Sequence, residues 1–282
     1  MKIRDLTTVE DCQRVVELEK RIWGYTDGDD VVGVPILVVT VKRGGILLGA
    51  FDDDRLVAFV YSLPGLKHGR PIQWSHMLGV LPYVREAGLG TTLKLAQRRR
   101  AMAMGIDLIE WTYDPLQALN AHLNFAKLGV IVGEYELNIY GESSSPLHRG
   151  TPTDRFVVQW WLRRAHVERR VAPGPGPGVR AADRTGAPQV NRVRMVGARL
   201  VPDGADLEVD EPGVLVRIPP GFGEMMAQAP GLALEWRMAT RDIFTRLFAR
   251  GYRAVDFFVD RAAGGGRYLL VKGEAAEIAA GV

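Results

Sequence analysis

The chain has 282 residues, of which 36 are Lys or Arg and 33 are Asp or Glu, so its net charge at neutral pH is +3. With 47% hydrophobic and 24% charged residues, the composition excludes disordered, fibrous and small disulfide-bonded proteins. The length predicts one large or two smaller globular domains. A single cysteine, Cys12, excludes an internal disulfide and fits a reducing, cytoplasmic compartment. The N-terminus carries charges where a signal peptide needs apolar residues, and no apolar run is long enough to span a membrane.

The predicted elements follow one another in an order typical of an α+β sheet covered by helices. Capping residues and apolar periodicity predict helices at 7–23, 35–42, 91–104 and 116–128. Alternating apolar residues and turn signals predict strands at 2–5, 46–51, 56–63, 74–81 and 107–113, with further strand pieces within 130–139 and 155–162. The polar turn at 52–54 makes the second and third strands an antiparallel hairpin.

A segment at 172–188 contains too much Pro and Gly for a helix or a strand, and it predicts a linker between two parts of the chain. The part at 189–282 is predicted to contain a strand at 214–218, a helix at 232–250 and a hairpin made of 255–259 and 268–272. This part is too small to be stable alone, so we expect an α+β extension packed on a domain at 1–171.

One loop in the first part has the pattern of an anion-binding loop. Arg85-Glu86-Ala87-Gly88-Leu89-Gly90 stands between the strand that ends near Leu81 and the helix that begins near Thr91. The first N–H groups of a helix have no partner within the helix, and glycine lets a phosphate approach them closely. Arg85 adds a positive charge. Neither the P-loop pattern nor the full dinucleotide pattern is present.

This RxxGxG loop, preceded by MLGVLP and followed by a helix, a strand and NAHLNFAKLGV, resembles the GNAT superfamily of acyl-CoA-dependent N-acyltransferases. The resemblance covers roughly 1–140. It implies a mixed, mostly antiparallel sheet flanked by helices, a loop that wraps the pyrophosphate of coenzyme A, and a strand whose backbone holds the pantetheine arm and the thioester. The residues that it places on the cofactor are Leu78, Gly79, Val80, Arg85, Glu86, Ala87, Gly88, Leu89, Gly90, Thr91, Asn120, Asn124 and Phe125.

The chain departs from the family pattern at Phe125, where many members have a tyrosine beside the leaving sulfur. Phenylalanine cannot donate a proton. Either the thiolate leaves unaided, or Tyr113, Tyr135 or a water molecule takes over as the acid.

Acylation of an amine needs a base, and three residues are candidates. His76 lies on the strand that leads to Val80, at a spacing that places it on the same face as Leu78, and imidazole titrates near neutral pH. Glu110 and Asp114 are the rivals, although Asp114 is equally suited to capping the helix after Pro115. By the resemblance, the backbone N–H of Val80 stabilises the oxyanion.

Arg237 and Arg241 lie one turn apart on the predicted polar side of the C-terminal helix. They form either a solvated or salt-bridged face, or a fork for a carboxylate of the acceptor or of a dicarboxylic acyl group such as succinyl. The histidines are scattered without ligand spacing, so no metal is predicted.

We therefore expect an N-acyltransferase that moves an acetyl or other short acyl group from acyl-CoA to a primary amine of an amino acid or small molecule. Cys12 lies outside the cofactor motif, so direct transfer is expected. The alternative is a non-catalytic acyl-CoA sensor or scaffold, suggested by Phe125. Association with nucleic acid rests only on arginine clusters, and we expect neither a nucleic acid nor a membrane as partner. A homodimer is compatible with such a fold.

Overall fold

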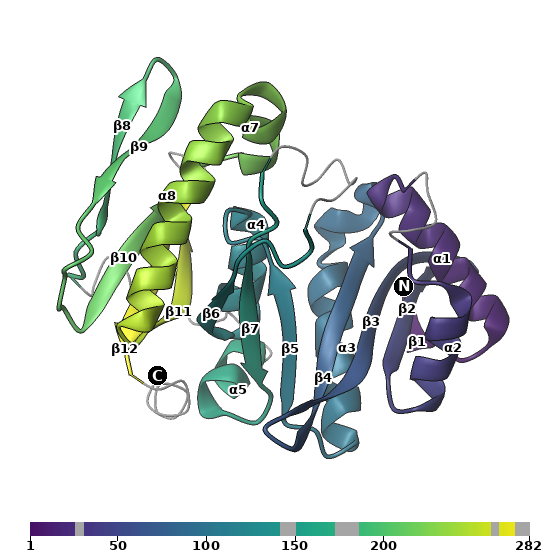
Figure 1. Cartoon of the computed structure of the whole chain (residues 1–282). Helices are drawn as coiled ribbons and strands as arrows, with labels where there is room; N and C mark the ends of the chain where they lie inside the picture. Colours follow the sequence, from purple (N-terminus) through teal and green to yellow (C-terminus); the bar gives the residue numbers. More distant parts are fainter. Residues whose placement is uncertain (26–30, 142–150, 173–185, 261–264, 274–282) are drawn as a thin grey trace. The chain divides into compact units, whose positions relative to one another are not determined.

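The computed structural model describes residues 1–25, 31–141, 151–172, 186–260 and 265–273. Its contacts divide the chain into two compact units, Met1–Trp111 and Thr112–Val282, which are described separately here (Figure 1). This boundary differs from the predicted linker at 172–188, most of which lies outside the described residues. The proposed division into domains at 1–171 and 189–282 stays a prediction.

The first unit follows the predicted order of elements. It contains β1 (Lys2–Asp5), α1 (Val9–Trp23), α2 (Val34–Lys42), β2 (Ile46–Asp52), β3 (Arg55–Lys67), β4 (Arg70–Val80), the 3-10 helix η1 (Pro82–Ala87), α3 (Leu89–Ala103) and β5 (Leu108–Tyr113), which crosses into the second unit after Trp111. The side chain of Thr8 caps α1 by accepting the N–H of Asp11, and Gly24 ends that helix in the left-handed conformation at φ 70°.

The strands of the first unit form one sheet in the order β1-β2-β3-β4-β5. The first three pairings are antiparallel, and β4 pairs with β5 in parallel. The hairpin of β3 and β4 is the longest, because its pairing continues to Lys67 and Arg70 around a turn with His68 at φ 48°. β2 and most of β3 are buried on both faces, so helices must cover both sides of this sheet.

Two glycines show which helix covers which face of β4. A Cβ on Gly79 would lie 2.8 Å from Ile22, so α1 covers the face to which Gly79 points. A Cβ on Gly90 of α3 would lie 3.6 Å from the side chain of Leu78. Because neighbouring residues of a strand point to opposite faces, α1 and α3 lie on opposite sides of the sheet (Figure 1).

The second unit contains the remaining elements. They are α4 (Ala118–Ala121), the π-helix η2 (His122–Leu128), β6 (Ile131–Glu136), β7 (Arg155–Trp161), α5 (Ala165–Val171), β8 (Asn191–Val196), β9 (Arg199–Ala205), β10 (Gly213–Ile218), α7 (Phe222–Gln228), α8 (Pro230–Ala249), β11 (Tyr252–Val259) and β12 (Gly266–Lys272). Five of these strands form a sheet in the order β7-β6-β11-β12-β10, and β8 and β9 form a separate hairpin.

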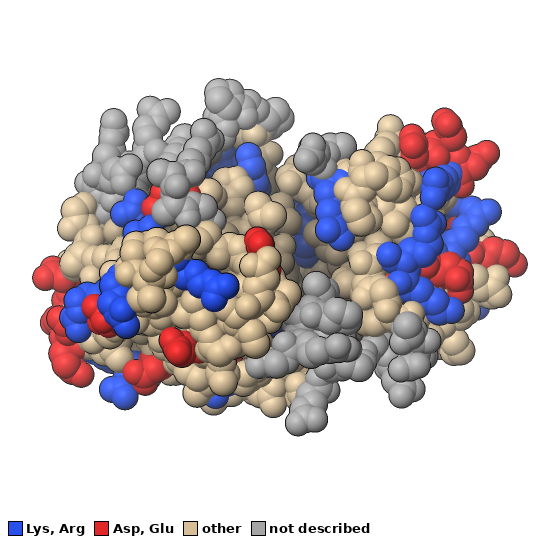
Figure 2. Space-filling model, turned by 90° about the horizontal axis from the view of Figure 1, so that it is seen from above, with Lys and Arg blue, Asp and Glu red and all other residues tan. Residues whose placement is uncertain are grey.

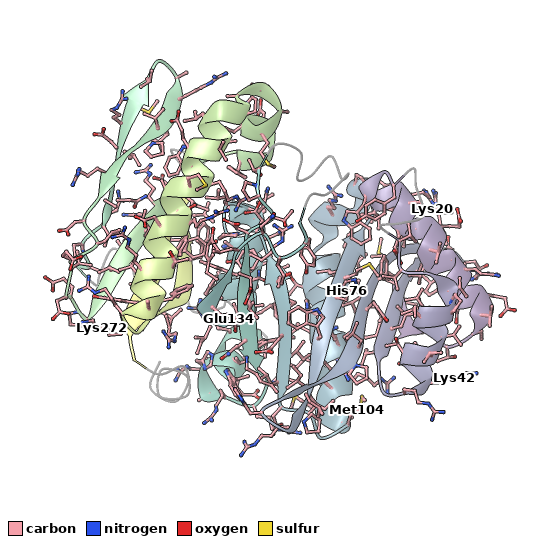
Figure 3. All side chains as sticks on the ribbon, viewed as in Figure 1. Lys20, Lys42, His76, Met104, Glu134 and Lys272 are labelled. Atoms are coloured by element: carbon pink, nitrogen blue, oxygen red, sulfur yellow. The ribbon has the colours of Figure 1, made fainter. Side chains whose placement is uncertain are left out.

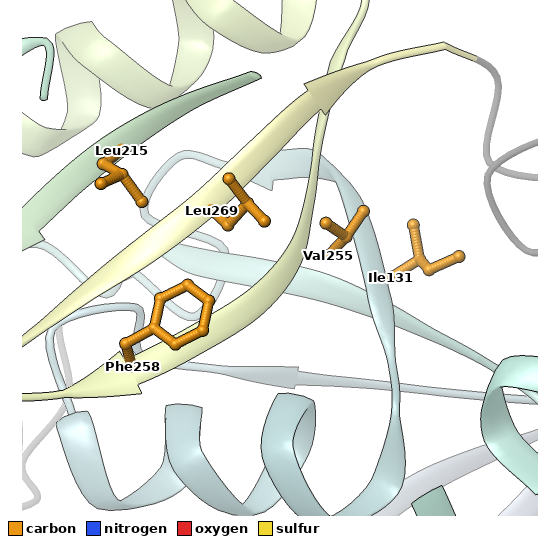
Figure 4. Packing of buried hydrophobic residues seen from close by; sticks show 5 residues of the cluster. All are labelled: Ile131, Leu215, Val255, Phe258 and Leu269. Carbon is orange, nitrogen blue, oxygen red and sulfur yellow. The ribbon is translucent and has the colours of Figure 1, made fainter. Parts of the chain in front are cut away.

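Apolar side chains cover both faces of these five strands. On the face of α8, the rings of Phe156 and Phe244 meet edge to face with centroids 4.7 Å apart, and Tyr268 lies against both. Leu269, the next residue of β12, points to the other face. There it belongs to a buried cluster with Ile131, Leu215, Val255 and Phe258 (Figure 4).

The outermost strand, β10, is covered along its free edge. The N–H of Leu215 donates to Pro188 O at 2.8 Å, and Leu215 O accepts from the N–H of Val190 at 2.9 Å. Further along, the side-chain amide of Asn191 accepts the N–H of Arg217 at 2.8 Å and donates to Arg217 O at 2.8 Å. The segment before β8, together with the first residue of β8, therefore fills the hydrogen-bonding positions of a missing neighbour strand.

The predicted α+β class is confirmed. The predicted strand at 214–218, the C-terminal helix and the final hairpin are all present, with bounds that shift by a few residues. The predicted helix at 116–128 is a short α4 followed by a π-helix, and the hairpin of β8 and β9 was not predicted. No helix within the described ranges has the length and apolar character that crossing a membrane requires.

Candidate acyl-CoA site

The RxxGxG segment forms the junction between β4 and α3 in the first unit. Gly88 takes the left-handed conformation at φ 67° and is the N-cap of α3. Among the side chains that the structure describes, none caps this helix, and its first turn contains no acidic residue. The N–H groups of this turn therefore remain available to an anion, with the partial positive charge of a 15-residue helix behind them.

Gly88 and Gly90 differ in what the fold requires of them. Gly88 needs its positive φ, which a side chain would strain. At Gly90 no positive φ is present, and an added Cβ would make only an ordinary contact at 3.6 Å with Leu78. Glycine this early in a helix lowers helix stability without a packing reason. A close approach by a ligand would explain Gly90.

Arg85 is exposed, and its Nε donates to Val80 O at 3.2 Å, which ties the junction to the end of β4. Leu89 is buried, whereas Gly88 and Thr91 are not. The side chains of Glu86 and Ala87 lie outside the described part of the structure.

The end of β4 has a free backbone edge. The N–H of Leu81 donates to Val57 O of β3 at 3.0 Å. Because backbone groups alternate along an antiparallel strand, the N–H groups of Leu78 and Val80 point away from β3, toward the β5 side. The register of β4 with β5 contains only Gln73 with Ile109 and Trp74 with Glu110, several residues earlier. The registered pairing of β4 with β5 thus ends before Leu78, and the expected donor at Val80 lies beyond the last pair.

His76 does not share a face with Leu78, contrary to the spacing argument. The register of β3 and β4 shifts between the pairs Tyr61 with Met77 and Ser62 with Ser75, so His76 lies in a β-bulge. His76 is labelled in Figure 3. Its ring meets that of Tyr61 edge to face, with centroids 6.2 Å apart. Tyr61 donates to Thr40 of α2 at 2.9 Å, which places His76 on the α1 and α2 side.

The imidazole of His76 is suited to accept a proton. It is exposed to solvent, yet burial of its inner side lowers its pKa below the ordinary value. It is therefore neutral at physiological pH. Glu110, in contrast, is 4% exposed and forms an ion pair with Lys67. A carboxylate held in this way is a weaker candidate for the base, and its catalytic role stays a prediction.

Glu19 is a titratable residue that the sequence analysis missed. It is fully buried on α1, where its Oε2 accepts the N–H of Val32 at 3.1 Å. Oε1 has no hydrogen-bond partner among the described residues. Burial raises the pKa of this carboxyl to about 7. The signal was available, because Glu19 falls on the apolar side of α1 with Val15 and Ile22, four residues after one and three before the other.

In the second unit, the NAHLNFAKLGV segment forms α4 and the π-helix. Asn120 is exposed, whereas Asn124 is 3% exposed and Phe125 is fully buried. The Phe125 ring packs edge to face on Tyr268 with centroids 5.6 Å apart. Phe125 thus has a packing role in the core. π-Helical turns occur often at functional sites, which keeps the expectation for the two asparagines open.

Of the two tyrosines considered as substitute acids, Tyr113 is buried and Tyr135 is half-buried in the second unit. The Tyr113 hydroxyl lies 3.0 Å from that of Tyr268, and the Tyr135 hydroxyl donates to Asp154 at 2.9 Å. Burial raises the pKa of both phenols above the ordinary value. Each hydroxyl therefore serves an internal hydrogen bond.

Asp114, Arg237 and Arg241 form internal ion pairs. Arg237 is 1% exposed, so its predicted position on a polar helix face was wrong, and both its terminal nitrogens bind the Asp114 carboxylate. Asp114 also accepts the N–H of Leu116 at 2.9 Å, but α4 begins only at Ala118 with Gln117 as its N-cap and no side-chain cap, so the predicted capping role was wrong. Arg241 forms two bonds of 2.8 Å to Asp154. Both arginine forks thus hold carboxylates of this chain, as in the salt-bridged alternative.

Surface charges of both signs are interspersed on the face shown in Figure 2, where blue and red side chains alternate among neutral ones. Within the described ranges, no three His, Cys, Asp or Glu side chains gather as metal ligands would. Cys12 is buried in α1.

Comparison with known proteins gives no match by sequence, either to a family model or to a curated protein. Among solved structures, the chain is similar to a GNAT-family acetyltransferase from Streptococcus pneumoniae, at 16% identity over 56% of this chain and 96% of the other, with a TM-score of 0.45. The ribosomal-protein-S18-alanine N-acetyltransferase from Escherichia coli matches at 14% identity over 57% and 93%, with a TM-score of 0.45.

A third similar structure is the paia N-acetyltransferase from Thermoplasma acidophilum in complex with coenzyme A. It matches at 16% identity over 56% of this chain and 96% of the other, with a TM-score of 0.40.

Proposed function

We propose that this chain is an acyl-CoA-dependent N-acyltransferase of the reducing cytoplasm, which moves an acetyl or other short acyl group to the primary amine of a small molecule. The observation that carries the proposal is the uncapped N-terminus of α3, with a glycine at Gly90 that the fold does not require. A pyrophosphate fits the chemistry of this site, since it would accept the open N–H groups and the charge of Arg85.

The free edge of β4 supports the same assignment. A pantetheine arm carries amide groups, and the backbone of Leu78 and Val80 can pair with them as a neighbouring strand would. The N–H of Val80 would then point at the thioester oxygen. A donor in that position stabilises the negative charge that develops on the oxygen during attack.

The reaction requires the acceptor ammonium to lose two protons. The first goes to a base and frees the nitrogen lone pair, which attacks the thioester carbon and forms the C–N bond. When the tetrahedral intermediate collapses, the C–S bond breaks, and the second proton from nitrogen ends on the coenzyme A sulfur. We assign the first proton to His76, because its imidazole is exposed and neutral at physiological pH.

The first experiment is calorimetric titration of the protein with acetyl-CoA and succinyl-CoA. Gly90→Glu places a carboxylate in the open turn of α3 and should abolish binding. Gly231→Glu is the matched control, because Gly231 is also the second residue of a helix, α8, and is exposed with no heavy atom near its Cβ position. Equal loss in both variants, or wild-type binding by Gly90→Glu, would contradict the proposed site.

Release of thiol from acetyl-CoA in the presence of tyramine, spermidine, kanamycin and an alanyl peptide then tests catalysis. Turnover with one of them supports the enzyme. Binding of coenzyme A without turnover on any of these amines would favour the sensor alternative. The buried position of Phe125 gives the residue that suggested this alternative a packing explanation instead.

A further inference from the structure

Lys94 is a buried amine in the middle of α3, with 3% of its surface exposed. Its Nζ donates to Ser75 Oγ at 2.8 Å and to Gln97 Oε1 at 3.2 Å, and it lies 3.7 Å from the centre of the Trp111 ring. Both of these hydrogen-bond acceptors are uncharged side chains. Burial lowers the pKa of this amine well below the ordinary value. A methionine side chain is one heavy atom shorter, so it would not reach Ser75 and Trp111 in the same way, and it would bury no polar group.

The two strand residues that Lys94 contacts occupy equivalent positions. The last registered pair of β4 and β5 is Trp74 with Glu110. Ser75 and Trp111 are the next residue on each strand, and a ladder that continued would place them opposite each other, about 4.8 Å apart. The Lys94 amine touches both side chains at the point where the two strands begin to separate.

We infer that Lys94 is a spacer, which sets the separation of β4 and β5 just beyond their last pair and so keeps the edge of β4 open for the acyl-CoA arm. Lys94 is then a positioning residue, and the inference rests on the proposed function. Its effect passes through Ser75 and Trp111 to the strands, since the amine itself lies inside the first unit.

The surroundings of Lys94 are satisfied without it. Gln97 donates its own hydrogen bond to Ser75 at 3.0 Å, and both residues are buried. These residues belong to a polar layer, by which we mean the buried polar side chains of Ser62, Gln73, Ser75, Lys94 and Gln97. In this layer, Gln73 accepts a hydrogen bond from Ser62 at 2.7 Å and donates one to Gly44 O at 2.7 Å. Removal of the amine therefore leaves no orphaned polar partner that would unfold the unit.

The test is Lys94→Met, with Gln97→Met as the matched control. Gln97 lies in the same helix and the same polar layer and touches Ser75, but the spacer contact of Lys94 with Ser75 and Trp111 survives its replacement. Lys94→Met should be at least as stable to heat as the wild type, yet bind coenzyme A roughly tenfold more weakly, because small displacements at a binding edge are costly. Gln97→Met should keep wild-type affinity.

Hydrogen exchange of the β4 amides provides a readout without coenzyme A. In Lys94→Met, closure of the two strands should slow exchange at Leu78 and Val80, and Gln97→Met should not. A general role of the polar layer in stability would instead lower the melting temperature of both variants and leave affinity unchanged, which would overturn the inference.

The two proposals fail in different ways. If the wild type binds no acyl-CoA, the proposed function is wrong, while slower exchange in Lys94→Met would still support a spacer. If the wild type binds acyl-CoA, and Lys94→Met binds equally well with unchanged exchange, the spacer is wrong and the proposed function stands.

Discussion

Asp114 holds the guanidinium of Arg237 through two hydrogen bonds, of 2.8 and 2.7 Å, inside the second unit. Burial alone would raise the pKa of the Asp114 carboxyl, but the charge and hydrogen bonds of Arg237 lower it below the ordinary value. The pair joins the end of β5 to α8, residues 123 positions apart in the sequence. The sequence analysis considered Asp114 as a base and Arg237 as a ligand for a substrate carboxylate. In the structure, each of the two is the ion-pair partner of the other.

Breaking this pair should be costly. Arg237→Met leaves the Asp114 carboxylate buried without its countercharge, and we expect the free energy of unfolding to fall by about 3–5 kcal/mol. Urea unfolding measures the loss. Arg246→Met, which removes an exposed pair with Asp242 on the same helix, should change stability by less than about 0.5 kcal/mol. A similar small loss in both variants would show that the buried pair is not required.

Glu19→Gln should alter how stability depends on pH. The folded-state pKa of Glu19, about 7, lies above its model value of 4.5, so the wild type keeps this proton in the folded state and loses stability as pH rises from about 4.5 to about 7. Each pKa unit corresponds to roughly 1.4 kcal/mol. Between about pH 4.5 and about pH 7, the free energy of unfolding of Glu19→Gln should therefore rise by about 3 kcal/mol relative to that of the wild type. Urea unfolding of both proteins at about pH 4.5 and about pH 7 measures this difference. Glu17→Gln, at an exposed position of the same helix, is the control. Parallel pH curves would contradict the prediction.

Two glycine replacements on opposite sides of β4 should change stability in opposite directions. A Cβ at Gly79 would lie 2.6 Å from the Phe59 ring, so Gly79→Ala should destabilise the chain by about 1–3 kcal/mol. Gly90→Ala has room, and it should raise stability by about 0.5–1 kcal/mol while it weakens coenzyme A binding. Thermal unfolding and calorimetry separate the two effects. Unchanged affinity in Gly90→Ala would remove the ligand-based reason for that glycine.

His76→Gln should lower kcat/KM by about 10²–10⁴-fold once an acceptor is known. Because the pKa of His76 is lowered, the wild-type rate should rise with pH along a limb below pH 6.5 and then stay level. The variant should lack this limb. Glu110→Gln tests the rival base, and a limb that disappears there but survives in His76→Gln would move the role to Glu110.

The order of elements in the first unit could be predicted because it depends on local signals. Thr8 and Gly24 mark the ends of α1, and apolar alternation marks β2 and β3. The extension of the β3 and β4 hairpin could not, because pairing across the sheet overrides the turn signals of Pro64 and Gly65. The π-helix likewise has no simple sequence pattern.

For the site, the loop was predictable because a helix start and a glycine are local features. The β-bulge that turns His76 away from the face of Leu78 depends on the register with β3, which period-two reasoning cannot supply. Asp114, which binds Arg237, and Ser75 and Trp111, which contact Lys94, lie far from these residues in the sequence. The burial of Arg237 and Lys94 could therefore not be read from the helix on which each stands. Glu19 was the exception, since a carboxyl on an apolar helix face is visible in the sequence.

The amide of Asn191 reproduces a peptide group at the edge of β10. An outermost strand with open N–H and C=O groups serves as a template on which another chain can add a strand. Here Leu215 has partners from the segment before β8 and Arg217 from Asn191, the first residue of β8, so the sheet cannot be lengthened at those positions. A fragment that began after Asn191 would keep β10 and α8 but would expose this template, and self-association would follow from the cut itself.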